Sequence, residues 1–153
     1  FLDGSQTHMI PATSYPPALQ EIVEFFADLP EADRREALVT YAESAKNHEP
    51  QSGEKFQVND ERHDEHCLDS VGVFLRFDAK NQVTIRITLG RKVQTLTRAL
   101  TTIICKGLGG LPAEEIKSIN PNFVPKIVGS ELMRLRSLTV YYVLERIQAA
   151  VSN

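Results

Sequence analysis

The chain has 153 residues, of which 42% are hydrophobic and 24% are charged, and its net charge is −3. This length fits one domain, and this share of apolar residues is enough to form a core. The slight negative charge lacks the basic footprint of nucleic-acid binding, and no apolar run approaches the roughly 20 residues that would cross a bilayer. We therefore expect neither nucleic acid nor a membrane among the partners.

The first residues look foreign to the fold. The stretch Gly4-Ser5-Gln6-Thr7-His8-Met9 resembles a vector-derived scar that ends at a start methionine. We therefore expect residues 1–10 to be a tag remnant or a disordered N-terminus, and residues 11–153 to form one domain.

The N-terminal half predicts two helices followed by a long loop. Apolar residues recur at helical spacing over 17–28, and a Leu-Pro pair ends that helix. A second helix, with an acidic first turn, is expected over 30–46. Residues 47–66 are mostly polar, with a short edge strand near Phe56 and Val58. Long loops of this kind tend to be functional or disordered.

The C-terminal half predicts an antiparallel hairpin followed by helices. Two strands, 70–77 and 82–89, flank a turn at 78–81. After the hairpin we expect a helix over 93–108 that ends on Gly107, Gly109 and Gly110. A short helix over 112–119 and a turn between Pro121 and Pro125 should follow it. The last helix is expected over 130–150. The whole order predicts an α+β fold, with a small antiparallel sheet of about three strands packed against several helices.

The two cysteines occur in different settings. Cys67 lies in the polar loop just before the hairpin, whereas Cys105 lies among apolar residues of a predicted helix. A thiol on a loop can reach a partner, while buried thiols are inert. Two cysteines make no disulfide framework in a chain of this length. We expect reduced thiols in the cytoplasm, or in an organellar matrix if a transit peptide was removed.

Four motifs over residues 18–150 form a consistent pattern. They are an arginine-rich turn at Leu29-Pro30-Glu31-Ala32-Asp33-Arg34-Arg35, a loop cysteine that leads into a strand at Cys67-Leu68-Asp69-Ser70-Val71, an apolar helix that closes on Gly107-Leu108-Gly109-Gly110-Leu111-Pro112-Ala113-Glu114-Glu115-Ile116, and Arg136 near the start of the last helix. This pattern resembles the SufE-like sulfur-acceptor proteins of iron–sulfur cluster assembly, and the third motif is its most specific part.

The chain also departs from that family's pattern. His66 stands where glycine is usual, Gly72 stands where tryptophan is usual, and Arg91-Lys92-Val93 replaces an Asp-Ser-Asp-like turn. The Asn-Gly pair that follows the family's arginine is absent. The resemblance is therefore to a divergent member.

The resemblance implies a persulfide relay. A pyridoxal-phosphate cysteine desulfurase would form a persulfide on its own cysteine, and the acceptor thiol, which maps to Cys67, would take the outer sulfur and carry it to an iron–sulfur scaffold protein. The acceptor would hold no metal or organic cofactor of its own. It would be an accessory protein that stimulates the desulfurase rather than a stand-alone enzyme.

The neighbours of Cys67 act on its thiol in opposite directions. Three acidic residues within three positions would raise its pKa, whereas a protonated His66 or His63 would lower it. Arg136 is a candidate contact to a loop carbonyl or to the partner. We expect a thiol that becomes strongly activated only when the desulfurase surface completes the site.

Two other functions fit the same residues. The lost glycine and tryptophan favour an interaction module with the SufE fold that no longer transfers sulfur. Alternatively, His63, His66 and Cys67, with His48 as a fourth ligand, would make a small metal-binding domain, because imidazole and thiolate are both zinc ligands.

Overall fold

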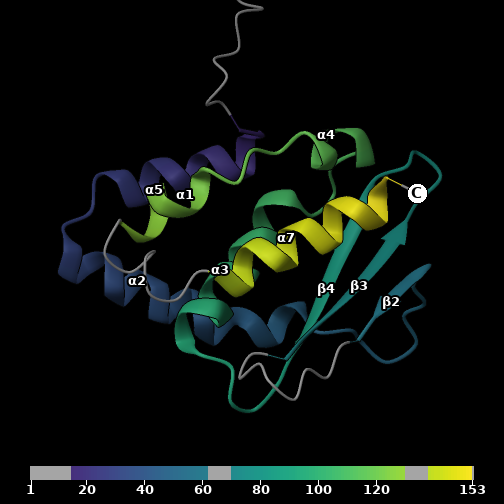
Figure 1. The fold of residues 1–153 in the computed structure, drawn as a ribbon, viewed down its shortest axis with the longest axis horizontal. Helices are drawn as coiled ribbons and strands as arrows, with labels where there is room; N and C mark the ends of the chain where they lie inside the picture. Colours follow the sequence, from purple (N-terminus) through teal and green to yellow (C-terminus); the bar gives the residue numbers. More distant parts are fainter. Residues whose placement is uncertain (1–14, 62–69, 130–137, 153) are drawn as a thin grey trace, which may run out of the picture.

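The computed structural model describes residues 15–61, 70–129 and 138–152 (Figure 1). The expected tag remnant, residues 1–10, lies outside these ranges. The candidate site residues His63, His66, Cys67 and Arg136 also lie outside them. The described residues form helices packed on a three-stranded antiparallel sheet, which confirms the predicted α+β class.

The sheet has the strand order β2-β3-β4 and forms one side of the molecule (Figure 1). Its strands are β2 (Val58–Asp60), β3 (Val71–Phe77) and β4 (Val83–Leu89). Along β4, buried Val83, Ile85 and Ile87 alternate with half-buried polar residues, so one face of the sheet meets the core. The hairpin is confirmed, and the predicted edge strand begins at Val58 rather than at Phe56.

The stretch before β2 is anchored to the outer face of the sheet, although its sequence predicts a loop. The Glu54 carboxylate accepts hydrogen bonds from Arg76 of β3 at 2.8 Å and from Arg86 of β4 at 3.2 Å. The ring of Phe56 packs on Phe74, with 5.6 Å between the ring centroids. This part of the long loop therefore adds a layer of side chains opposite the hydrophobic core.

Two helices precede the sheet. Helix α1 (Pro17–Ala27) begins with proline at its first position, where the missing N–H has no acceptor to lose. Helix α2 (Glu31–Glu43) ends one turn earlier than predicted, and the chain continues as a 3-10 helix, η2 (Ser44–His48). The residues of η2 are mostly poor helix formers that precede Pro50, which accounts for the tighter turn.

Helix α3 (Thr95–Leu108) is central and packs against α1, α2, β4 and the last helix. It is buried on most of its surface, as expected for a helix inside a domain. The expectation that Gly107 ends this helix was wrong. Gly107 lies within it, where a Cβ would sit 3.0 Å from Leu19 Cδ1 of α1. The helix ends at Leu108 with Gly109 as its C-cap, and Gly110 follows with a φ of +87°, which favours glycine.

Three further helices complete the described fold: α4 (Ala113–Lys117), α5 (Phe123–Val128) and α7 (Leu138–Val151). The turn expected between Pro121 and Pro125 is present at 121–122, and the chain enters α5 directly after it. Pro125 is the third residue of α5, where a backbone N–H has no partner within the helix, so proline is tolerated. Helix α7 lies across the sheet and contacts β3 (Figure 1).

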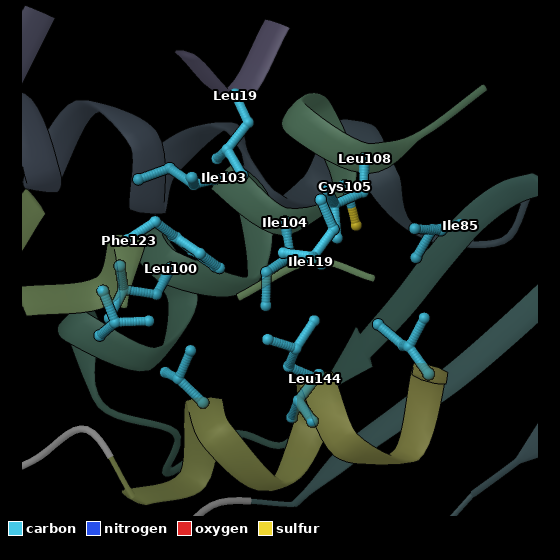
Figure 2. Close-up of a cluster of buried hydrophobic side chains, with 14 of the residues drawn as sticks. Leu19, Ile85, Leu100, Ile103, Ile104, Cys105, Leu108, Ile119, Phe123 and Leu144 are labelled. Carbon is cyan, nitrogen blue, oxygen red and sulfur yellow. The ribbon is translucent and has the colours of Figure 1, made fainter. Parts of the chain in front are cut away.

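The hydrophobic core lies where α3 meets the other helices and the inner face of the sheet. Figure 2 shows Leu19 of α1, Phe123 of α5, Leu144 of α7 and Ile85 of β4 around the side chains of α3. Cys105 of α3 belongs to the same cluster. In the part of the chain that the structure describes, no helix combines the length and the apolar character needed to cross a membrane.

Candidate functional site

The described ends of β2 and β3 fix where the cysteine segment attaches. Strand β2 ends at Asp60, which pairs with Val73, and β3 begins two residues earlier at Val71. The segment between them therefore leaves and re-enters the sheet at the same end. Cys67 lies in it, three positions before Ser70 and outside the described residues.

Arg146 of α7 binds both strands at this end of the sheet. Its Nε lies 2.9 Å from Asp60 Oδ2, and its two other nitrogens donate hydrogen bonds of 2.8 Å to the carbonyl oxygens of Asp60 and Val71. The side chain of Arg146 is 12% exposed. A charge-assisted, nearly buried set of bonds thus holds together the two strand ends that flank the cysteine segment.

Arg146 belongs to no motif that the sequence displays, and the predicted arginine was Arg136 instead. Arg136 lies outside the described residues, so its expected contact to a loop carbonyl stays a prediction. Arg146 makes contacts of this kind from within α7. The sequence feature that could have identified Arg146 is its position beside Val143 and Ile147 on the last helix. A cation at the edge of an apolar helix face needs hydrogen-bond acceptors there.

A second arginine holds the turn next to Ser70. The backbone N–H of Gly90 donates to the carbonyl of Ser70 at 2.9 Å, which continues the β3–β4 ladder by one step. Arg98 of α3 then donates to the carbonyls of Gly90 and Val93, at 2.8 Å and 3.2 Å. The turn between β4 and α3 is therefore fixed beside the entry of the cysteine segment.

Gly72 occupies a tight position on β3. A Cβ there would lie 2.3 Å from Thr88 Oγ1, 3.3 Å from a ring carbon of Phe74 and 3.5 Å from Glu61 Cγ. The space that a larger residue would need is filled by these three side chains. In this chain, a side chain as large as tryptophan would not fit at position 72 without a shift of these neighbours.

Cys105 is a core residue, as the sequence predicts. It is 5% exposed, and burial raises the pKa of its thiol to about 12, against a smaller opposing effect of the Arg86 charge. A thiol in this state is a weak nucleophile at neutral pH. This cysteine is therefore unsuited to accept sulfur.

The surroundings of His48 disfavour a further positive charge on its imidazole ring. Burial lowers its pKa, and the charges of Arg86 and Lys106 lower it further. Among residues 15–61, 70–129 and 138–152, no three histidine, cysteine or acidic side chains are grouped as metal ligands. The other three members of the predicted metal set lie outside those ranges.

The arginine-rich turn between α1 and α2 has a structural role. Arg34 donates to the carbonyls of Phe26 and Leu29 at the end of α1, at 3.3 Å and 3.5 Å. Arg35 pairs with Glu31 at 3.5 Å on the exposed side of α2. Arg34 of α2 therefore links the two helices and caps α1, whereas the pair of Arg35 lies within α2.

A groove of about 500 Å³ runs between β2 and α7, beside the Arg146 contacts. Its lining residues are Val58, Asp60, Tyr142, Glu145, Arg146, Ala149 and Ala150. Tyr142 is 61% exposed, and Leu138, one turn earlier on α7, is 72% exposed. The end of the sheet that holds the cysteine segment thus adjoins open apolar surface.

No protein-family model matches the chain. The chain is 32% identical over 114 residues to SufE-like protein 1, chloroplastic/mitochondrial, of Arabidopsis thaliana. The matched region is 74% of this chain but 29% of that relative, so the chain spans less than a third of its length.

The structural comparison supports the fold. A solution structure of a hypothetical protein from Thermus thermophilus superimposes with a TM-score of 0.71 at 23% identity, covering 90% of this chain and 96% of that one. At this identity the likeness concerns the fold alone. The sequence relative, at 32% identity over 74% of this chain, places the chain in the SufE-like family as a divergent member.

Proposed function

We propose that this protein is a sulfur carrier of iron–sulfur metabolism that accepts sulfane sulfur on Cys67. The family relationship supports a role in sulfur transfer at a general level. The observation that carries the specific proposal is the contrast between the two cysteines. Cys105 is sealed in α3, whereas Cys67 lies in the segment whose two ends are held by Arg146.

The proposed step is a thiol–persulfide exchange. The Cys67 thiolate attacks the outer sulfur of a persulfide on a cysteine desulfurase, which forms a new S–S bond on Cys67. The S–S bond of the donor breaks, and the donor cysteine leaves as a thiolate. No net oxidation occurs, so the carrier needs no metal or organic cofactor, and the pyridoxal phosphate belongs to the donor enzyme.

The remaining site residues have supporting roles in this proposal. His66, when protonated, lowers the pKa of the Cys67 thiol, against the like charges of the nearby acids. Arg136 contacts the segment or the partner. Because these effects oppose one another, the desulfurase surface completes the activation. The protein therefore acts as an accessory to the desulfurase and passes its sulfur to an iron–sulfur scaffold.

The proposed thiol chemistry limits the cellular compartment in which this protein can work. A carrier thiol works only where thiols stay reduced, as in the cytoplasm or an organellar matrix. The name of the sequence relative places that protein in the chloroplast and the mitochondrion. We propose the cytoplasm for this protein, with an organellar matrix as the alternative.

Matched cysteine variants test the proposal. With a cysteine desulfurase from the same organism and cysteine as substrate, Cys67→Ser is expected to abolish stimulation, while Cys105→Ser retains it. Mass spectrometry of the wild type should show an adduct of one sulfur atom on Cys67. If both variants stimulate as well as the wild type does, the proposal is wrong.

A second candidate is an interaction module that binds the same partner without carrying sulfur. The packing around Gly72 favours it, because the space for the usual tryptophan is occupied by Thr88 and Phe74. The mass spectrum separates the two functions. Binding to the desulfurase without any sulfur adduct on Cys67 would support the module.

A further inference from the structure

Two adjacent cations stand beside the entry of the cysteine segment. Arg91 and Lys92 follow Gly90 directly, and Gly90 is hydrogen-bonded to Ser70, the first described residue after Cys67. Both cations are exposed. Neither forms an ion pair with any residue in the described part of the chain. Figure 1 shows this turn, between β4 and α3, at the end of the sheet where β3 begins.

The backbone of this turn is held in place. Arg98 binds the carbonyls on both sides of the two cations, at Gly90 and Val93, and the side chain of Val93 is buried. The turn therefore presents Arg91 and Lys92 from a fixed position. Fixed charges lose less entropy on binding than charges on a free loop.

The charges of this turn contrast with those around them. The chain as a whole has a net charge of −3. Several other described cations are already neutralised: Arg35, Arg76, Arg86, Lys117 and Arg146 each pair with a carboxylate. Two neighbouring cations without such partners among the described residues place two positive charges side by side on this turn, beside a cysteine segment whose sequence carries three acidic residues within three positions of Cys67.

We propose that Arg91 and Lys92 form a docking contact for an acidic patch on the sulfur-donating protein. The inference rests on the proposed function and specifies which surface its partner uses. Three residues of fully extended chain span at most about 11 Å. A donor that reaches Cys67 must therefore approach Ser70, and with it the turn that carries the two cations. Opposite charges across such a contact speed association and align the partners.

A double charge reversal tests this contact. The variant Arg91→Glu/Lys92→Glu should bind the cysteine desulfurase at least about tenfold more weakly at low salt, because like charges then face each other. The matched control is Lys55→Glu/Lys80→Glu, which changes the net charge equally at exposed positions toward the far end of the sheet. The control should bind within about twofold of the wild type.

Salt and sulfur loading distinguish the outcomes. Raising the salt concentration should weaken wild-type binding and largely remove the difference between the wild type and the Arg91/Lys92 variant. At saturating desulfurase, the variant should still load one sulfur on Cys67. If the variant and the control bind equally while the wild type loads sulfur, the docking contact is wrong and the carrier function stands. If the wild type neither binds the desulfurase nor loads sulfur, both proposals fail.

Discussion

Arg146 and Asp60 form an ion pair of 2.9 Å across 86 positions of sequence, at the point where β2 ends. The same guanidinium also binds the carbonyl oxygens of Asp60 and Val71, so its removal would leave three acceptors without their donor. We expect Arg146→Met to lower the free energy of unfolding by about 2 to 4 kcal/mol, measured by urea denaturation. It should also slow sulfur loading, because the ends of the cysteine segment lose their common anchor.

The control for that experiment is Arg35→Met, which removes an exposed ion pair on α2. Such pairs contribute about 0.5 kcal/mol or less, so this variant should unfold almost as the wild type does. Equal losses in the two variants would show that the contacts of Arg146 add nothing beyond surface charge.

Glu54 should govern part of the acid stability. The backbone N–H of Gln51 and then the side chain of Arg76 lower the pKa of this carboxyl from 4.5 to about 2. Because the pKa is lower in the folded state, the ionised carboxylate stabilises the fold fully above pH 4.5, and this contribution is lost as the pH falls toward about 2. Glu54→Gln should therefore be less stable at pH 7 and should show a flatter acid limb.

Urea titrations of both proteins between pH 7 and pH 2 measure this difference. Glu31→Gln, at an exposed pair on α2, is the matched control and should keep the wild-type acid limb. Parallel curves for Glu54→Gln and the wild type would mean that the anchor on the outer sheet face does not depend on this charge.

Cys105 should resist alkylation in the folded protein. With a pKa of about 12, its thiolate fraction at pH 8 is about one in ten thousand, and its side chain is buried. Iodoacetamide at pH 8 should therefore modify Cys67 alone, and both cysteines should react in urea. Peptide mass spectrometry gives the sites, and Cys105→Ser provides the reference. Rapid native labelling of Cys105 would contradict the burial seen in α3.

Gly107 should be intolerant of a larger side chain. A methyl group there would approach Leu19 Cδ1 at 3.0 Å and Leu19 Cβ at 3.1 Å. We expect Gly107→Ala to destabilise the fold by about 1 to 2 kcal/mol, because the clash outweighs the better helix propensity of alanine. Thermal unfolding measures the loss. Leu19→Val in the same chain should recover part of it, whereas a stabilised Gly107→Ala protein would refute the close contact.

The sequence predicts features that depend on local patterns. The alternation of Val83, Ile85 and Ile87 indicates a half-buried strand, and the apolar neighbours of Cys105 indicate a core position; both are confirmed. The turn before Pro125 is confirmed at 121–122, but the helix that begins at Phe123 was not predicted, because a proline pattern alone does not separate a turn from the first turn of a helix. The position of Gly107 within α3 depends on the approach of α1, which no local pattern records.

The site was less accessible to sequence reasoning than the fold. The motif around Cys67 shows which thiol to consider, but the anchors beside it come from distant elements. Arg146 reaches Asp60 from the last helix, and Arg98 reaches Gly90 from the first turn of α3. Such contacts depend on how α7 and α3 lie on the sheet, and a single sequence gives no measure of that arrangement.

The burial of Cys105 also determines what could follow the proposed loading of sulfur on Cys67. This chain has two cysteines, and the second is enclosed by the aliphatic side chains of the core. Under the proposed function, a sulfane sulfur held on Cys67 therefore finds no accessible second thiol among these 153 residues, and this domain does not discharge by closing a disulfide between its own two cysteines. Discharge requires an acceptor or a reductant from outside the domain, so the lifetime of the loaded state is set by the concentration of those groups around it.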